Sequence, residues 1–305
     1  MKMMLEDKVV SVTGAGRGVG REIALLCAQY GAAVIVNDAG VGGSGEGGDA
    51  GPAQKTVDDI VSQGGRAYAN MADVADPGAA ATIIEDAVRM FGRIDAVVNN
   101  AGILRDAIWH KMSYEDWRAV IDVNLNGPFN VCKAAAPYFR EQKSGSFIHF
   151  TSTSGLIGNL GQANYSAAKL GLVGLSQSIA LDMARVGVRS NCIAPFAWSR
   201  MTASIPAKSP EQIERVERLK TMSADKIAPL VVYLASDAAQ DVTNQIFSVR
   251  RNEISLFSKP RPIRSMIKLE GWTPETVASE AMPAFKNDFA RADEVSAHVF
   301  PYDPI

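Results

Sequence analysis

The chain has 305 residues, of which 47% are hydrophobic and 21% charged, so it can build one sizeable α/β core or two small ones. Its net charge is −2 and its pI about 6.0, which excludes the broad basic face typical of nucleic-acid binding. No apolar run reaches the roughly 18 residues of a membrane span, and the N-terminus lacks a signal pattern. We therefore expect a soluble, cytoplasmic protein without nucleic-acid or membrane partners.

Cysteine and histidine residues predict neither a disulfide framework nor a bound metal. Cys27, Cys132 and Cys192 are far apart in apolar segments, which indicates buried free thiols in a reducing compartment. The three histidines lack metal-ligand spacing. His149 lies in a strand-like run, where a core position is expected.

The first structural signal is a strand over residues 8–12, a glycine turn over 13–20 and a helix that ends near Tyr30. Glycines let the backbone approach a pyrophosphate, and the helix N-terminus favours its negative charge. This succession predicts a dinucleotide site. The residues expected to contact the cofactor here are Gly14, Arg17, Gly18, Val19 and Gly20.

A second strand over 32–37 ends at Asp38, about 20 residues after the glycine turn. A carboxylate there accepts hydrogen bonds from the ribose hydroxyls of NAD and repels the 2′-phosphate of NADP. Arg17 argues weakly for NADP, because a basic residue in the turn can meet that phosphate. We give Asp38 more weight and predict NAD, although an ordinary turn residue is the alternative interpretation.

Residues 40–52 are too glycine-rich to pack as a regular element. They follow Asp38 at the cofactor edge of the sheet. Three interpretations stay open: a connection without a role, a mobile flap over the adenosine end of the cofactor, and a contact for a long substrate.

Helices and strands keep alternating through the middle of the chain. Helices are expected over 53–63, 77–91, 113–142 and 163–185, and strands over 66–71, 94–98, 145–151 and 188–193. Asn124 interrupts an otherwise apolar helix, where an amide is costly unless it is hydrogen-bonded. We expect Asn124 to hold a water or to kink the helix near the active site.

The stretch 152–169 carries the chemistry. A strand delivers Ser152, and the following helix presents Tyr165 and Lys169 on one face because they are four residues apart. An ammonium favours the anionic form of a neighbouring phenol, so the pKa of Tyr165 is expected to fall from about 10 toward neutrality. Such a phenol exchanges a proton with an alcohol or ketone. Taken alone, this pattern also fits a solvated surface pair.

The apolar strands predict a parallel sheet covered on both faces, in a doubly wound, Rossmann-like α/β domain. No Ser/Pro-rich linker interrupts the alternation before about residue 249. Residues 5–250 are expected to form this single domain, and residues 251–305 a C-terminal extension.

Taken together, these motifs resemble the short-chain dehydrogenase/reductase family. The matching motifs are the glycine turn, Asn-Asn-Ala-Gly over 99–102, Asn124, Ser152 and Tyr165-x-x-x-Lys169, in the family's order and spacing. The resemblance implies that a hydride passes between a substrate carbon and a nicotinamide ring, with Tyr165 as general acid/base. Lys169 would lower the pKa of Tyr165 and bind ribose, Ser152 would bind the substrate oxygen, and Asn124 would hold a water that links Lys169 to solvent.

The same resemblance implies further cofactor contacts. Asp73 and Val74 would meet the adenine. The residues expected to flank the nicotinamide and its ribose are Asn100, Ala101, Gly102, Pro195, Ala197 and Thr202. It also implies a homodimer or homotetramer, through the helices expected over 113–142 and 163–185.

A narrower resemblance is to the D-3-hydroxyacyl-CoA dehydrogenase part of multifunctional β-oxidation enzymes, also called 17β-hydroxysteroid dehydrogenase type 4. The glycine-rich insert, the run 161–165 and the segment 194–202 carry it, whereas Phe196 departs from the Gly of many family members. It implies oxidation of a 3-hydroxyacyl-CoA, steroid side chains included. A dehydrogenase of a free alcohol such as a 17β-hydroxysteroid, a 3-oxoacyl-carrier-protein reductase and a non-catalytic NAD sensor remain alternatives.

In the extension, Thr273 and Pro274 predict the start of a short amphipathic helix over 276–285. The extension is expected either to contact another subunit or to cover the substrate. In the second case a set of basic residues would hold the phosphates of CoA, namely Arg250, Arg251, Lys259, Arg261 and Arg264.

Overall fold

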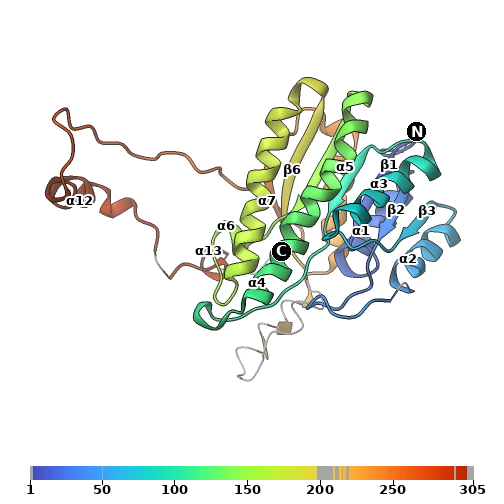
Figure 1. Ribbon diagram of the computed structural model, residues 1–305, viewed down its shortest axis with the longest axis horizontal. Coiled ribbons are helices and arrows are strands. Elements are labelled where there is room, and N and C mark those ends of the chain that lie inside the picture. Colours follow the sequence, from blue (N-terminus) through green and yellow to red (C-terminus); the bar gives the residue numbers. More distant parts are fainter. Residues whose placement is uncertain are drawn as a thin grey trace.

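The structure, a computed structural model, describes residues 3–49, 51–197, 209, 213–214, 216–217, 220–291 and 293–300. Helices cover both faces of one eight-stranded sheet (Figure 1). The strand order is β3-β2-β1-β4-β5-β6-β7-β8, and all neighbours are parallel except β7 and β8. The expected doubly wound α/β fold is confirmed.

The strands are β1 (Val9–Thr13), β2 (Ala33–Asn37), β3 (Arg66–Asn70), β4 (Ala96–Asn99), β5 (Gly145–Phe150), β6 (Val188–Phe196), β7 (Ile246–Arg250) and β8 (Glu253–Leu256). Every residue of β1, β2, β4 and β5 is buried, which explains their continuous apolar runs. The antiparallel β8 continues the sheet beyond residue 250, where we expected it to end, because Arg251 turns the chain back with a φ of 58°.

The longer helices are α1 (Gly18–Gln29), α2 (Gly51–Ser62), α3 (Pro77–Phe91), α4 (Tyr114–Ile121), α5 (Gly127–Gln142), α7 (Ala163–Asp182) and α10 (Ala228–Ala235), and the short ones are α6 (Thr153–Leu156), α11 (Pro274–Thr276), α12 (Met282–Phe285) and α13 (Ser296–Val299). Alternate strand residues face two cores. Val34 and Val36 pack with α1, α2 and α10, whereas Ala33 and Ile35 pack with α3 and α5.

Asn124 lies inside the helix expected over 113–142. The helix continues from α4 into α5 through a π-helical turn, Asp122–Asn126, and the Asn124 side chain is fully buried. A π turn at an interior polar residue often marks a functional position. The helix therefore accommodates Asn124 by widening locally.

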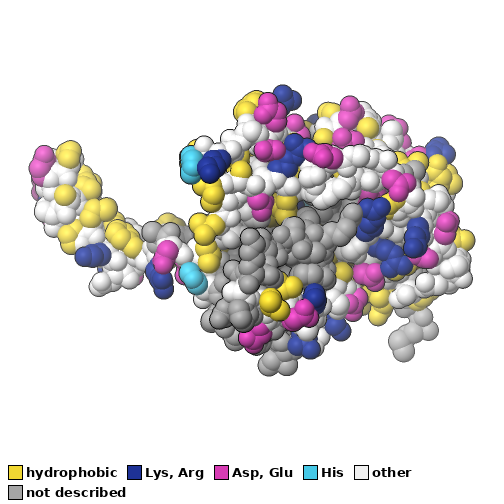
Figure 2. Space-filling view, turned by 90° about the horizontal axis from the view of Figure 1, so that it is seen from below, with side chains coloured by type: hydrophobic (Ala, Val, Ile, Leu, Met, Phe, Trp, Pro, Cys, Tyr) yellow, Lys and Arg dark blue, Asp and Glu magenta, His cyan; other side chains and the backbone are white. Residues whose placement is uncertain are grey.

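After β8 the chain leaves the body as an extended arm, bears α11, a π turn (Val277–Ala281) and α12 near its tip, and returns to α13 beside α6 and α7 (Figure 1). The Thr273 side chain accepts a hydrogen bond from Thr276 N, which confirms the expected helix start. Arg264 pairs with Asp288 (3.0 Å) and Lys268 with Glu280 (2.7 Å), so the arm folds on itself. Hydrophobic side chains are exposed along it (Figure 2).

The basic residues proposed as a phosphate site are not brought together. Arg250 is buried at the end of β7, where its guanidinium lies 6.0 Å from the Phe196 ring and 5.5 Å from the Phe300 ring. Arg264 instead pairs with Asp288 in the arm. Arg250 is therefore not available to a CoA phosphate, whereas a phosphate role for the other four residues stays a prediction.

Buried residues include all three cysteines, each a free thiol, and His149. His149 lies between Asn99 and Ser190, at 3.3 Å and 3.2 Å, which confirms its expected core position. Among the described helices, none combines the length and apolar character that a membrane crossing requires. The described residues also contain no metal-binding group of His, Cys, Asp or Glu.

Candidate active site

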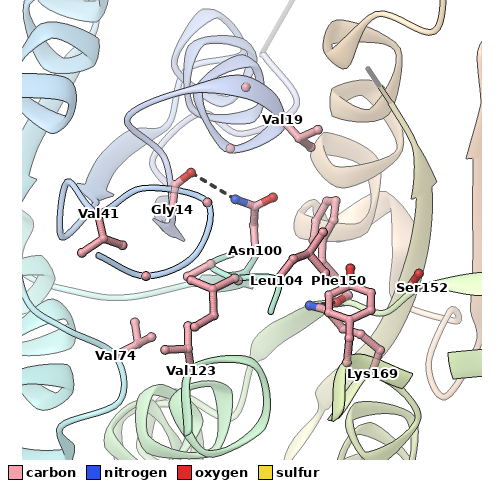
Figure 3. Close-up of a pocket in the computed structure, with 18 of the residues that line it drawn as sticks. Gly14, Val19, Val41, Val74, Asn100, Leu104, Val123, Phe150, Ser152 and Lys169 are labelled. Carbon is pink, nitrogen blue, oxygen red and sulfur yellow. Dashed lines mark hydrogen bonds between the residues drawn. The ribbon is translucent and has the colours of Figure 1, made fainter. Parts of the chain in front are cut away.

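A cavity of about 1050 Å³ opens at the carboxyl ends of the parallel strands. The chain builds β1, β2 and β3 in one direction and then β4 to β7 in the other, so the cavity lies at the point where the strand order reverses. Figure 3 shows its cofactor-side residues on the segments after β1, β2 and β3, with Ser152 and Lys169 at the opposite side.

Nearly all residues predicted for the site line this one cavity. They are Gly14, Arg17, Gly18, Val19, Gly20, Asp38, Asp73, Val74, Asn100, Ala101, Gly102, Ser152, Tyr165, Lys169, Pro195 and Ala197. Asn124 lies behind the wall, and Thr202 lies outside the described residues.

The glycine turn is packed so closely at Gly14 and Gly20 that neither position has room for a side chain. A Cβ on Gly20 would lie 2.2 Å from Gly14 O, and one on Gly14, which has a φ of +65°, would lie 2.9 Å from Ala101 Cα. The Asn100 amide donates to Thr13 O (2.9 Å) and to Gly14 O (3.1 Å), the bond drawn in Figure 3. The turn is therefore held in one shape before any ligand binds.

The start of α1 faces the cavity and suits an anion. Gly18 has open space around its Cα and a φ of +54°, and within the described chain the Arg17 side chain makes no capping bond to α1. The first N–H groups of a helix favour negative charge. The turn thus fits a pyrophosphate, as a dinucleotide requires.

Asp38 is fixed by backbone donors on both sides. Its Oδ2 accepts a hydrogen bond from Gly16 N and its Oδ1 one from Gly40 N, both at 2.8 Å. A carboxylate oxygen has a second acceptor position, so Asp38 can still accept from ribose hydroxyls. This geometry fits an adenosine ribose at the end of β2.

The glycine-rich segment forms part of the cavity wall. Gly42 and Gly43 line the cavity, Gly43 O accepts from Leu104 N (2.9 Å), and Ser44 O accepts from Arg105 Nε (2.8 Å). The segment therefore lies against the chain that follows β4, which argues against a connection without a role. Arg105 is a wall residue that sequence reasoning missed.

The catalytic candidates meet at the far end of the cavity. The Lys169 Nζ lies 5.5 Å from the centre of the Tyr165 ring and donates to Phe150 O (2.8 Å). The Ser152 hydroxyl accepts from Ser154 N (3.1 Å) and lies near enough to the Tyr165 hydroxyl to lower the pKa of the phenol. A substrate oxygen beside Ser152 would thus also meet the tyrosine.

The pKa of Tyr165 moves in the opposite direction to our expectation. Burial raises it to about 12, the bond with Ser152 works against this rise, and the carboxylate of Asp106 adds to it. Burial also lowers the pKa of Lys169 to about 8. The Lys169 ammonium is directed to the carbonyl of Phe150, so its charge does not offset the effect of burial on the phenol.

Asn124 holds the backbone of Ile103, a residue of the cavity wall, in place. Its Oδ1 accepts from Ile103 N (2.9 Å) and its Nδ2 donates to Ile103 O (3.0 Å). A Cβ on Gly102 would lie 3.4 Å from Asn124 Oδ1 and 3.6 Å from Lys169 Nζ, so the three groups are neighbours. The water relay through Asn124 stays a prediction.

A glycine turn at a strand-order reversal, joined to a Ser152, Tyr165 and Lys169 set, defines a class of oxidoreductases that act on CH–OH groups with a nicotinamide dinucleotide. Comparison with known proteins agrees. Residues 8–209 match the short chain dehydrogenase family. The chain belongs to this family.

Three relatives show how far the likeness extends. A short-chain type dehydrogenase/reductase of Mycobacterium tuberculosis is 47% identical over 237 residues, 78% of this chain and 80% of that protein. The peroxisomal hydratase-dehydrogenase-epimerase of Saccharomyces cerevisiae is 43% identical over 282 residues, 92% of this chain but only 30% of that protein. The crystal structure of a short chain dehydrogenase from Mycobacterium avium matches with a TM-score of 0.82 and 38% identity, and the match covers 96% of this chain and 99% of that one.

Proposed function

We propose that this chain is an NAD-dependent dehydrogenase that moves a hydride between a secondary alcohol or ketone and its cofactor, with 3-hydroxyacyl-CoA thioesters as substrates. The observation that carries the proposal is the convergence of Ser152, Tyr165 and Lys169 at one end of a cavity whose other end holds a fixed Asp38.

The preference for NAD rests on Asp38. Two backbone N–H groups hold its carboxylate in place, so it cannot turn away from a 2′-phosphate without losing both bonds. A negative phosphate against this carboxylate would be repelled. Arg17 is exposed at the turn, and it would have to overcome that repulsion for NADP to bind well.

In the proposed reaction the nicotinamide supplies the site that accepts or donates the hydride. Ser152 holds the substrate oxygen by a hydrogen bond, and Tyr165 transfers the proton to or from that oxygen. Lys169 adds a positive charge near the phenol and would contact the ribose. Gly102 and Asn124 keep Lys169 and the chain after β4 at a fixed separation.

The thioester assignment rests on the resemblance of this chain to the 3-hydroxyacyl-CoA dehydrogenase part of multifunctional enzymes. The yeast relative carries a dehydrogenase in its name, and this chain spans 30% of its length. The cavity of about 1050 Å³ extends past Tyr165 to Asn159 and Leu160, which leaves room for a long substrate beside the cofactor.

The experiment is NAD⁺ reduction with matched panels of 3-hydroxyacyl-CoA thioesters and free secondary alcohols, 17β-hydroxysteroids included. We expect turnover on the thioesters and a clear preference for NAD⁺ over NADP⁺. Turnover on free alcohols alone would retain the chemistry but overturn the substrate class. Cofactor binding without turnover on either panel would favour a non-catalytic sensor.

We also propose a homodimer or homotetramer built on α5 and α7. Both helices pack on the same side of the sheet, since Val131 of α5 and Ile179 of α7 belong to one core cluster. Phe129, Leu170 and Leu181 are exposed on them. Exposed apolar patches of this kind are typical of subunit contacts. Sedimentation of an active monomer would contradict the proposal.

A further inference from the structure

Beyond Ser152 and Tyr165 the cavity has a polar wall that the proposed proton transfer does not use. It consists of Asp106, Ser154, Asn159 and Gln162, which we call the Gln162 cluster, and all four residues line the cavity. They come from the chain after β4, from α6, from the loop after α6 and from the N-terminal cap of α7. Tyr165 follows Gln162 by three residues, so the cluster adjoins the catalytic phenol.

Hydrogen bonds fix the orientation of the Gln162 amide. Its Oε1 accepts from Ser154 Oγ (2.8 Å) and from Asn159 Nδ2 (3.0 Å). Its Nε2 donates to Asp106 Oδ2 (2.8 Å). Rotating the amide by half a turn would place its oxygen against the Asp106 carboxylate, where two acceptors would face each other. The amide therefore holds Asp106 as an oriented carboxylate.

After these bonds are made, the second oxygen of Asp106 remains an acceptor, and the amides of Asn159 and Gln162 each keep one further N–H. An ionised carboxylate only accepts hydrogen bonds, and Oδ1 of Asp106 is not engaged by Gln162. The neighbouring cation, Arg105, is directed to Ser44 O (2.8 Å) and to Asp116 (3.5 Å). Partial burial raises the pKa of Asp106, and the hydrogen bond from Gln162 opposes this rise.

We propose that Asp106, oriented by Gln162, is a specificity-determining residue that accepts a hydrogen bond from a donor on the substrate beyond the reacting oxygen. The proposal deepens the function proposed above and rests on it. In a CoA thioester the first donor past the sulfur is the amide N–H of the pantetheine arm, two methylene groups away. A free alcohol without a second donor gains nothing from Asp106.

The test compares two thioesters of one 3-hydroxy acid. The N-acetylcysteamine thioester retains the amide N–H, and an S-alkyl thioester of equal length lacks it. Each is assayed with the wild type, Asp106→Ala and Gln162→Met, and with Asp182→Ala as a control at the other end of α7. A hydrogen bond to a charged group contributes roughly 1.5–3 kcal/mol, so Asp106→Ala should lower kcat/KM for the amide thioester about 10-fold to 100-fold.

The readout is the ratio of kcat/KM for the amide thioester to that for the S-alkyl thioester, because Asp106 also raises the pKa of Tyr165 and its removal can change the rate on both substrates. This ratio should fall about 10-fold to 100-fold in Asp106→Ala, and turnover of the S-alkyl thioester shows that the variant is folded. Gln162→Met should give the same selective loss, and Asp182→Ala none. An equal loss on both thioesters would overturn the proposal, because Asp106 would then act on the chemistry or the fold. If the wild type turned over neither thioester, the proposed function and this assignment would both fail, an outcome distinct from an equal loss.

Discussion

The two halves of the cavity are built in different ways. The cofactor half, after β1, β2 and β3, consists largely of backbone groups, as when Gly16 N and Gly40 N fix Asp38, with the Asn100 side chain as an added support of the turn. The catalytic half, after β4 and β5 and on α7, is held by side chains from distant segments, as when Gln162 joins Asp106 to Ser154. The cofactor half can therefore be recognised from short sequence motifs, whereas the catalytic half depends on how distant segments come together in the fold.

The halves also differ in their electrostatics. The carboxylates of the cofactor half lie at strand ends and accept backbone N–H groups. In the catalytic half, burial raises the pKa of Tyr165 to about 12 and lowers that of Lys169 to about 8. We therefore expect substitutions in the cofactor half to change binding and those in the catalytic half to change turnover.

The largest effect is expected for Tyr165→Phe. General acid–base catalysis contributes about 10²-fold to 10⁴-fold, so the rate of NAD⁺ reduction should fall by that factor. The ring and its packing remain, so NAD binding measured by calorimetry should be unchanged. Turnover that persists would show that Tyr165 is not the acid/base and would remove the proposed division between the halves.

Next comes Gly20→Ala in the cofactor half. The new Cβ would lie 2.2 Å from Gly14 O, so the glycine turn must shift. Overpacking of this kind costs about 1–3 kcal/mol, and both the free energy of unfolding and the NAD affinity should fall. The control is Gly174→Ala on α7, where a Cβ meets nothing within 4 Å, and helix propensity predicts a small gain in stability. A loss of the same size in the control would contradict the steric argument.

The pH dependence of stability provides the third test. Burial lowers the pKa of His149 from 6.5 to about 3, so between these values the unfolded chain binds a proton that the folded chain excludes. Stability should therefore fall as the pH falls below about 6.5, by up to about 1.4 kcal/mol per pH unit from this residue.

Urea unfolding of the wild type and of His149→Asn over this pH range measures the effect. The variant should show a shallower dependence on pH, whereas His110→Asn, which changes an exposed histidine, should keep the wild-type slope. If the free energy of unfolding depended on pH equally in all three proteins, the buried His149 would not be the source of the loss of stability at low pH.

The smallest effect is expected for Asp38→Ala. Removing the carboxylate takes away both the ribose contact and the repulsion of a 2′-phosphate, so the ratio of NAD⁺ to NADP⁺ affinity should fall about tenfold or more. The rate at saturating cofactor should change little, because Tyr165 and Ser152 are untouched. A large loss of that rate with an unchanged cofactor ratio would mean that Asp38 only shapes the turn.

The strands and most of the candidate site residues could be predicted from the sequence because they belong to short local motifs. The strands appear in the sequence as apolar runs because both of their faces are buried. The turn after β1 is rich in glycine because Gly14 and Gly20 leave no room for a side chain. The candidate residues from Gly14 to Ala197 that line the cavity follow from these elements and from the resemblance to the family. Arg105 and the Gln162 cluster gave no such signal, apart from the position of Gln162 just before Tyr165.

Burial changed other expectations. Four-residue spacing places Lys169 and Tyr165 on one helix face, but it does not show that Lys169 is directed to Phe150 O or that desolvation dominates the pKa of the phenol. Phe196, which stands where many family members have Gly, packs its ring 5.0 Å from that of Phe300, a contact between residues more than a hundred positions apart that the sequence did not indicate.

The sequence by itself therefore determined the sheet, the glycine turn, the acidic residue after β2 and the Ser152, Tyr165 and Lys169 set, because each depends on neighbours along the chain or on spacing within one element. Only the tertiary structure decided that Asp106 lines the cavity, where Arg250 is buried and that burial raises the pKa of Tyr165. These properties depend on desolvation and on contacts between segments that meet only when the chain is folded.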